Sequence, residues 1–223
     1  MDNIKKKLDF LLSNIKIIHE KSFHSKSKVP KLVAVSKKQE DHKVDEAILC
    51  GQKIYGENRV QEAINRWQKR LDIYKNLELR LIGPLQTNKV KQALNLFDII
   101  ETIDREKIAT EIAKNMGEKT KTKKFYVQVN TGNEPQKSGI DPLEADKFIQ
   151  YCVKELYLPI VGLMCIPPVS EEASMHFLLL QKIAKRNNLP ELSMGMSSDY
   201  EDAIKFGATS VRIGSLLFGE RKV

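Results

Sequence analysis

A regular alternation of short apolar runs with longer helical stretches constrains the fold of this chain more than any other feature. The alternation begins with KLVAVS at residues 31–36, a short β-branched run that follows Pro30, and it continues to residue 213. Such runs are typical of buried strands, and the amphipathic stretches between them are typical of helices. Strands that alternate with helices form βα units, and these units build parallel sheets. The sequence therefore predicts an α/β protein.

Eight strands can be placed from this alternation, at residues 32–35, 53–56, 78–82, 98–102, 124–129, 160–164, 191–194 and 210–213. Helices are expected between them, at residues 41–50, 58–74, 88–96, 105–116, 142–155, 171–188 and 199–206. A further helix should precede the first strand, because apolar residues of the N-terminal segment recur at alternating spacings of four and three. These residues are Ile4, Leu8, Leu11, Ile15 and Ile18.

Eight such strands in a chain of 223 residues fit a (β/α)8 TIM-type barrel, whose usual size is about 250 residues. The alternative is an open, doubly wound parallel sheet. That fold normally has a GxGxxG or P-loop motif after its first strand, and neither motif follows the first strand here. No shift in composition marks a second domain. We therefore expect residues 1–223 to form a single barrel domain, with residues 1–26 forming an N-terminal helix that packs on the barrel.

Composition is that of an ordinary soluble globular protein, with 41% hydrophobic and 30% charged residues. Cys50, Cys152 and Cys165 form no CxxC pair, so neither a disulfide framework nor a metal site is expected, and the cytoplasm is the natural compartment. Residues 1–7 lead into an amphipathic pattern, which does not match a signal peptide. The most apolar window, residues 158–169, is too short to span a bilayer, so no membrane association is expected.

The net charge of +8 raises the question of a nucleic-acid partner. However, the lysines are scattered along the whole chain, and their densest run, at residues 119–124, contains no interleaved aromatic side chains. That pattern is more typical of a solvated loop than of a nucleic-acid interface. Nucleic acid is therefore not expected as a partner.

The end of the first predicted strand supplies a candidate reactive lysine. In a parallel barrel the functional groups lie at the carboxyl ends of the strands, and the first strand ends in Ser36 and Lys37. Lys37 directly follows four apolar residues, so its amine is expected at the rim of a dry interior. Desolvation lowers the pKa of a lysine and leaves more free amine to attack an aldehyde. The alternative is an ordinary exposed lysine at the start of a loop, as its neighbour Lys38 illustrates.

The ends of the last two predicted strands supply a candidate phosphate site. Loops at these positions of a barrel often hold a phosphate through backbone amides and hydroxyl groups. Ser197, Gly214 and Ser215 provide the hydroxyls and the unhindered backbone, and Arg212 shares the strand face of Gly214. For Ser197 and its neighbour Ser198, a helix N-cap is the alternative interpretation.

The second predicted strand ends in the run from Tyr55 to Asn58, and the third leads into Gly83 and Pro84. Glycine lets the backbone approach a ligand, and Asn58 offers both a donor and an acceptor. A lysine amine and a phosphate site at the same barrel mouth would suit an aldehyde phosphate. Pyridoxal 5'-phosphate (PLP) is such a molecule.

Six sequence runs resemble those of a known protein family. They occur in the same order as in that family and extend over nearly the whole chain. It is the pyridoxal phosphate homeostasis protein family, which is similar to the N-terminal barrel of alanine racemase and lacks the second, all-β domain of the racemase. The runs are LVAVSK (32–37), YGENRVQEA (55–63), IGPLQTNKVK (82–91), GLMCIPP (162–168), LSMGMSSD (192–199) and VRIGSLLFGER (211–221).

The resemblance implies roles for individual residues. It makes Lys37 the lysine that holds PLP as a Schiff base, and it places Arg212 where the racemase barrel has an arginine against the pyridine nitrogen. Asn58 is a weaker match, as a polar contact near the ring. The residues that fall at phosphate-binding positions are Ser197, Gly214 and Ser215.

The sequence also departs from the commoner pattern of that family. Lys38 and Gln39 stand where Thr-Lys is frequent, and Arg59 stands where tyrosine is frequent. These differences change the basic rim of the expected site. They leave the residues expected to hold the cofactor intact.

The resemblance implies a cytoplasmic protein of vitamin B6 homeostasis without established catalytic activity, which sequesters PLP or delivers it to apo forms of PLP-dependent enzymes. A monomer is expected. The alternative is a weak amino-acid racemase. Arginine cannot give its proton to the pyridine nitrogen, so the cofactor would be a poor electron sink, and a racemase also needs a second base. Tyr55, Tyr126 and Tyr200 are the conceivable bases.

Overall fold

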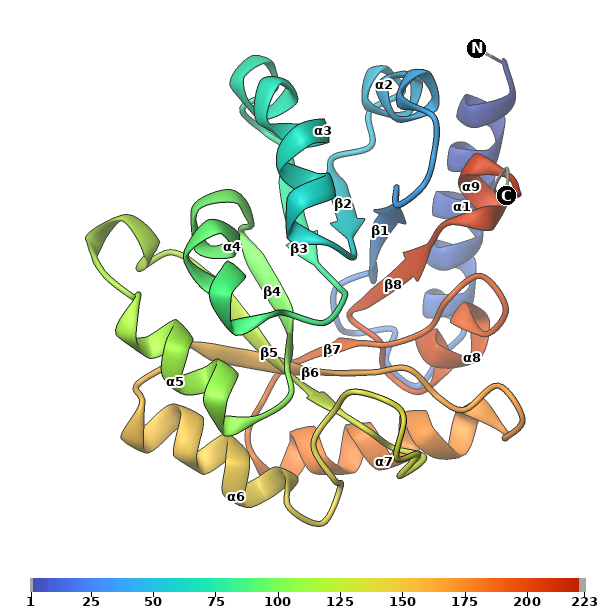
Figure 1. The fold of residues 1–223 in the computed structure, drawn as a ribbon. Helices are drawn as coiled ribbons and strands as arrows, with labels where there is room; N and C mark the ends of the chain where they lie inside the picture. Colours follow the sequence, from blue (N-terminus) through green and yellow to red (C-terminus); the bar gives the residue numbers. More distant parts are fainter. Residues whose placement is uncertain (1, 221–223) are drawn as a thin grey trace.

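The computed structural model describes residues 2–220 and shows a closed barrel of eight parallel strands in the order β1 to β8 (Figure 1). β1 pairs with β2 on one side and with β8 on the other, where Lys31 lies opposite Ser210 and Ala34 opposite Ile213. This last pairing closes the barrel and confirms the predicted (β/α)8 fold. The strands are β1 Lys31–Val35, β2 Ile54–Glu57, β3 Glu78–Leu81, β4 Ile99–Ile103, β5 Lys124–Val129, β6 Ile160–Cys165, β7 Glu191–Ser193 and β8 Ser210–Ile213.

Helices connect successive strands and cover the outside of the barrel (Figure 1). Their buried apolar residues pack against the outer face of the strands and form one continuous core. The helices are α2 Asp41–Leu49, α3 Val60–Ile73, α4 Val90–Leu96, α5 Glu106–Lys114, α6 Ala145–Gln150, α7 Ala173–Arg186, α8 Tyr200–Lys205 and α9 Ser215–Phe218. Short 3-10 turns lie at Thr87–Lys89 (η1) and Glu118–Thr120 (η2).

The N-terminal helix α1 (Asp2–Glu20) packs against α2, α8 and α9. In Figure 1 it lies beside the last elements of the chain, next to α8 and α9. The residues of the predicted apolar stripe lie on the covered face, where Leu8, Leu11 and Ile15 are each 1% exposed. Their burial explains why this stripe recurs at helical spacing.

The helix predicted at residues 142–155 differs most from the structure. Asp141 accepts a 2.8 Å hydrogen bond from the backbone N–H of Leu143, which forms a local turn and delays the helix until Ala145. After α6 the chain continues as a π-helical turn, Tyr151–Glu155 (η3), which ends with a 3.1 Å bond from Leu156 N to Tyr151 O. The N-terminal helix, expected to extend to residue 26, ends at Glu20, where the hydroxyl of Ser22 donates a 2.8 Å hydrogen bond to the carbonyl of His19 and the chain turns. The other predicted strands and helices occur, with boundaries shifted by at most two residues.

The interior of the barrel is unusually polar. Interiors of such barrels are normally filled by branched apolar side chains. Here Arg80 of β3 and Glu101 of β4 are both 0% exposed and form a 2.9 Å ion pair. A small apolar cluster of Ile99, Tyr126 and Met164 is separate from the main core. A layer of charged side chains therefore lies in the interior of the barrel.

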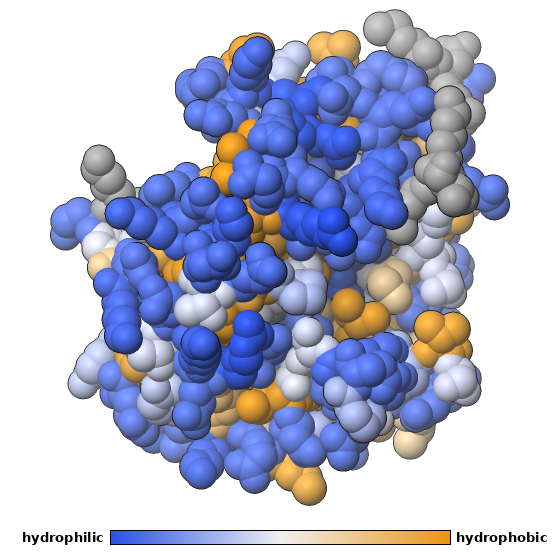
Figure 2. Space-filling view, viewed as in Figure 1, coloured by the Kyte–Doolittle hydropathy of each residue, from blue (hydrophilic) through white to orange (hydrophobic). Residues whose placement is uncertain are grey.

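Figure 2 shows one face of the molecule, on which hydrophilic side chains predominate and apolar ones appear as small, separate patches. Across residues 2–220, no helix is both long enough and apolar enough to cross a lipid bilayer.

Candidate functional site

A cavity of about 310 Å³ opens at the carboxyl ends of the strands, and its lining comes from the last residues of β1 and β8 and from the segments that follow β1, β2, β3, β6, β7 and β8. All six residues that the sequence singled out for a cofactor site line this one cavity. They are Lys37, Asn58, Ser197, Arg212, Gly214 and Ser215. The remaining lining residues are Val35, Ile82, Ile166, Met196 and Ser198.

Lys37 lies in a tight turn directly after β1. The backbone N–H of Gln39 donates a 3.1 Å hydrogen bond to the carbonyl of Ser36, and Lys38 between them has a φ of 56°. A positive φ is uncommon for a residue with a side chain, and it persists only when surrounding contacts impose it. Lys37 is therefore presented by a constrained turn.

Arg66 of α3 supplies those contacts. Its Nη1 donates a 2.5 Å hydrogen bond to the carbonyl of Ser36, and its Nη2 donates a 2.7 Å bond to the carbonyl of Gln39. Its Nε donates to the carboxylate of Asp41 at 3.0 Å. One guanidinium thus bridges both ends of the turn that contains Lys37. Sequence reasoning missed Arg66, because an arginine on an amphipathic helix gives no sign of a partner 30 residues away.

Arg212 of β8 is 4% exposed and is held in a fixed orientation. Its Nη1 donates to the hydroxyl of Ser193 at 2.8 Å, and its Nη2 donates to the carbonyl of Cys165 at 2.7 Å. Burial raises the pKa of the Cys165 thiol to about 12, which keeps this thiol neutral beside the guanidinium. Arg212 is therefore a fixed positive charge on the wall of the cavity.

The contact to Ser193 links Arg212 to the charged layer inside the barrel. Ser193 donates a 2.6 Å hydrogen bond to Glu101, whose other oxygen accepts from Arg80 at 2.9 Å. Burial alone would lower the pKa of Arg80, but the charges of Glu101 and Glu78 outweigh it and raise that pKa. The sequence analysis did not predict this series of contacts. Its only sign was the presence of charged residues in two short apolar strands, Glu78 and Arg80 in β3 and Glu101 in β4.

Ser197 and Ser198 lie in the turn between β7 and α8. The N-cap of α8 is Asp199, and its carboxylate accepts a 2.6 Å hydrogen bond from the backbone N–H of Met196. The N-cap interpretation of the two serines is therefore wrong. The backbone N–H groups of Asp199 and Tyr200 donate to the carbonyl of Met196, at 3.1 and 2.9 Å, and close the turn. The N–H groups of the two serines come before these donors in the chain and take no part in these bonds.

Gly214 and Ser215 directly follow β8, where Gly214 is the N-cap of α9 and Ser215 is its first residue. The first backbone bonds of this turn run from Leu217 and Phe218 to the carbonyl of Gly214, at 3.1 and 2.9 Å. The N–H of Ser215 is therefore not used by these helical bonds, and Ser215 lines the cavity. Serines from two separate turns thus line one space.

Asn58 lies directly after β2, where two chain segments approach closely. A Cβ on Gly83 would lie only 2.3 Å from the carbonyl oxygen of Asn58, so this approach requires glycine. The hydroxyl of Thr102 fixes the same segment by donating a 2.8 Å bond to the carbonyl of Gly83. Among residues 2–220, the buried side-chain oxygen of Asn58 has no hydrogen-bond partner.

None of the three tyrosines considered as second bases lines the cavity. The hydroxyl of Tyr55 donates to the carbonyl of Gln52, and that of Tyr126 donates to Glu191 inside the barrel. The hydroxyl of Tyr200 accepts from Asn14 of α1 at 2.6 Å. Burial raises the pKa of each tyrosine, so all three stay neutral near pH 7.

Comparison with known proteins agrees with this architecture. The family model "Alanine racemase, N-terminal domain" matches residues 7–222. The chain is 39% identical over 201 residues to the pyridoxal phosphate homeostasis protein of Aquifex aeolicus, covering 86% of this chain and 87% of the relative. It is 35% identical over 231 residues to that of Vibrio cholerae, covering 99% and 98%.

A solved structure is similar along its whole length. This is PipY of Synechococcus elongatus PCC7942 with PLP bound, which has 32% identity and a TM-score of 0.82 and is covered over 97% of this chain and 100% of its own. The matches in sequence and in structure thus both extend over nearly the whole chain. The chain belongs to the pyridoxal phosphate homeostasis protein family, within the larger group of alanine racemase N-terminal domains.

Proposed function

We propose that this protein binds PLP in the cavity at the mouth of its barrel and serves in the intracellular homeostasis of the cofactor. The observation that supports this most directly is the meeting of Lys37, Arg212, Ser197 and Ser215 in one cavity of about 310 Å³. These residues come from the carboxyl ends of β1, β7 and β8. Together they provide an amine for the aldehyde of PLP, a donor for the ring nitrogen, and two hydroxyl groups for the phosphate.

The residues present fit the cofactor in size and in chemistry. Cavities that accept small molecules begin at about 300 Å³. Hydroxyl and backbone N–H groups of Ser197 and Ser215 suit a phosphate, because hydrogen bonds to a charged acceptor are the stronger ones. Apolar side chains, those of Val35, Ile82 and Ile166, suit the faces of an aromatic ring.

Arg212 would donate to the pyridine nitrogen. Its guanidinium has more N–H donors than the two hydrogen bonds to Ser193 and Cys165 use. Because an arginine keeps its proton, the ring nitrogen beside it would stay unprotonated. The ring would then withdraw electrons poorly, which favours holding the cofactor over chemistry on an amino acid.

Lys37 would hold the cofactor covalently. When bound, PLP supplies an aldehyde, which condenses with a primary amine with loss of water to form a Schiff base. The turn fixed by Arg66 would hold Nζ of Lys37 at the cavity and limit its motion. Such preorganisation favours attachment because less side-chain freedom is lost when the bond forms.

We propose a carrier and not a racemase. A racemase needs a second proton-transfer group across the ring, and Tyr55, Tyr126 and Tyr200 all have partners elsewhere. A carrier needs only reversible attachment.

Apo forms of PLP-dependent enzymes would then be the acceptors of this carrier, and we expect it to work as a monomer. Cys50, Cys152 and Cys165 are all unpaired, which supports the reducing cytoplasm as its compartment.

Borohydride reduction followed by peptide mapping tests the proposal. Protein mixed with PLP should show a visible absorption band, and after reduction the pyridoxyl group should lie on Lys37. Lys37→Ala should abolish both results, whereas Lys38→Ala should keep them, which controls for loss of a lysine in the same turn. Label on Lys38, Lys89 or Lys137 in the wild type would refute the assignment.

A further inference from the structure

We infer that the N-terminal helix α1 supports the cofactor site, and that Asn14 of this helix is a positioning residue for the turn that carries Ser197. α1 precedes the alternation of strands and helices, yet it packs against α2, α8 and α9 (Figure 1). Each of these three helices begins at or shortly after a proposed PLP ligand, which is Lys37, Ser197 or Ser215. The inference rests on the proposed function, because that proposal assigns these residues to PLP.

Asn14 connects α1 to the first residues of α8. Its Nδ2 donates to the hydroxyl of Tyr200 at 2.6 Å and to the carboxylate of Glu201 at 3.0 Å. Tyr200 is 5% exposed, and its hydroxyl donates in turn to the same carboxylate at 3.3 Å. One amide group on α1 therefore holds the first two residues of α8.

Tyr200 carries this constraint to the turn before it. Its backbone N–H donates to the carbonyl of Met196 at 2.9 Å and closes the turn that contains Ser197 and Ser198. Gly195, at the start of the same turn, has a φ of 90°, and a Cβ on it would lie only 3.0 Å from Cα of Tyr200. The turn thus lies directly against Tyr200, and a shift of Tyr200 would move the serines.

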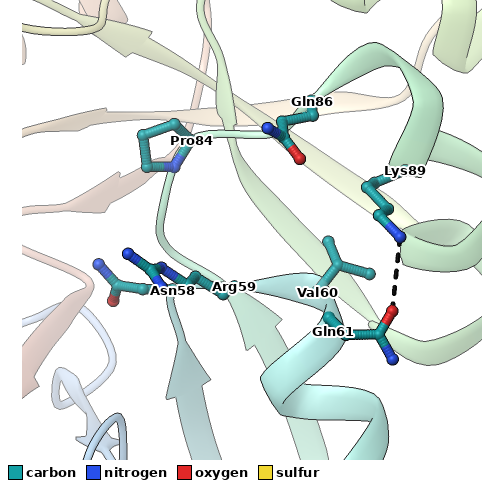
Figure 3. A pocket seen from close by; sticks show the side chains of 7 residues that line it. All are labelled: Asn58, Arg59, Val60, Gln61, Pro84, Gln86 and Lys89. Carbon is teal, nitrogen blue, oxygen red and sulfur yellow. Dashed lines mark hydrogen bonds between the residues drawn. The ribbon is translucent and has the colours of Figure 1, made fainter.

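The segments that follow β2 and β3 are joined in a different way. Nζ of Lys89 donates to the side-chain oxygen of Gln61 at 3.4 Å, so a side-chain bond links these two segments directly (Figure 3). The start of α8 is instead tied to a helix at the other end of the chain, with Asn14 186 residues from Tyr200. Gln61 therefore offers a control, since its amide links segments of the same mouth without reaching the serine turn.

Titration with PLP and with pyridoxal, which lacks the phosphate, tests the role of Asn14 in binding. Asn14→Ala should lower the ratio of PLP affinity to pyridoxal affinity by about threefold or more, because the loss of a hydrogen bond frees the serine turn. Gln61→Ala should change this ratio by less than about twofold. The absorption band of the Schiff base measures both ligands.

A double-mutant cycle tests whether Asn14 acts through Tyr200. Tyr200→Phe keeps the buried ring and removes the hydroxyl that accepts from Asn14, so it should lower the same ratio. Combined with Asn14→Ala, it should lower the ratio by less than the two single effects together, because both changes break one contact. Independent, additive effects would refute the route through Tyr200.

Hydrogen exchange of the ligand-free protein tests positioning without PLP. In Asn14→Ala the backbone N–H groups of Met196, Asp199 and Tyr200 should exchange faster than in the wild type. The N–H of Gln39, which closes the turn after β1, should exchange as before. A merely structural role of α1 would accelerate both turns.

The inference fails if exchange in the serine turn is unchanged, if both turns accelerate equally, or if Asn14→Ala weakens PLP and pyridoxal binding equally. It also fails if Gln61→Ala lowers the affinity ratio as much as Asn14→Ala does. A wild type that binds neither ligand would refute the proposed function. Hydrogen exchange would still decide whether Asn14 positions the serine turn.

Discussion

The hydroxyl of Ser36 donates a 2.7 Å hydrogen bond to the buried carboxylate of Glu57 and so joins the end of β1 to the end of β2. The same carboxylate oxygen accepts from Nε1 of Trp67 at 3.0 Å and from Nη1 of Arg66 at 3.4 Å. A buried carboxylate is tolerated only when it is paired and hydrogen-bonded in this way. Glu57 therefore positions Arg66, and Arg66 holds the turn that contains Lys37.

This arrangement predicts that Arg66→Lys weakens PLP binding. A lysine keeps the charge but cannot bridge the carbonyls of Ser36 and Gln39, so the turn would loosen. We expect a loss of about 1 to 3 kcal/mol in the free energy of unfolding and a slower attachment of PLP. Urea denaturation and the growth of the visible band measure the two effects.

Arg70→Lys is the matched control, because Arg70 lies one turn further along α3 and pairs with Asp45 at 2.6 Å. It should lower stability without slowing attachment. If both variants slow attachment equally, Arg66 acts only through the stability of α3.

The two serines should matter for the phosphate and not for the ring. Ser197→Ala and Ser215→Ala should each weaken PLP binding by about 1 to 2 kcal/mol, because each removes one hydrogen bond to a charged acceptor. Binding of pyridoxal, which lacks the phosphate, should hardly change. Fluorescence titration of both ligands measures the difference. Equal losses for the two ligands would mean that the serines act through folding.

Arg212 should determine whether the bound ring can withdraw electrons. Arg212→Glu supplies a group able to hold a proton on the ring nitrogen, so a bound amino acid should exchange its α-hydrogen with deuterium faster than in the wild type. Arg212→Gln introduces a side chain of the same size as the glutamate but without a titratable group, so it should not accelerate exchange. Mass spectrometry of the amino acid measures the rate. Wild-type racemisation at about 1 per second or more would favour the enzyme alternative.

Removing one partner of the ion pair inside the barrel should lower the free energy of unfolding. Glu101→Leu leaves Arg80 with one fewer partner in a fully buried place, and we expect a loss of about 3 kcal/mol in the free energy of unfolding. The double variant Arg80→Met with Glu101→Leu should be more stable than Glu101→Leu alone, because no uncompensated charge remains. Urea denaturation of the three proteins measures this. A double variant less stable than the single would contradict it.

The order of elements was predictable from the sequence because each element depends on local pattern. A short apolar run such as residues 32–35, bounded by Pro30 and followed by a helical pattern, favours a buried strand, and the stripe from Ile4 to Ile18 can be buried only as one face of a helix. The closed barrel then places all strand ends at one mouth. For that reason the sequence also indicated which residues meet there, and Lys37 and Ser215 do line one cavity. Their roles toward PLP stay predictions.

Helix boundaries were less predictable, because side chains compete with the helix for backbone groups. Asp141 accepts from the N–H of Leu143 and delays α6, although the apolar spacing continues through this segment. The N-cap of α8 was likewise Asp199 and not one of the serines before it. Both outcomes depend on a choice between local hydrogen bonds that the apolar pattern does not reveal.

Only the tertiary structure decided the polar interior and the support of the lysine. Arg80 lies 3.3 Å from the hydroxyl of Ser210, which is 130 residues away in the sequence, and this contact exists because closure sets the register of β8. Arg66 meets the turn after β1 only because α3 packs beside it. By itself, the sequence determined which segments are strands and helices and which residues follow them. The partners of the buried charges follow from register and packing, which depend on the whole barrel being closed.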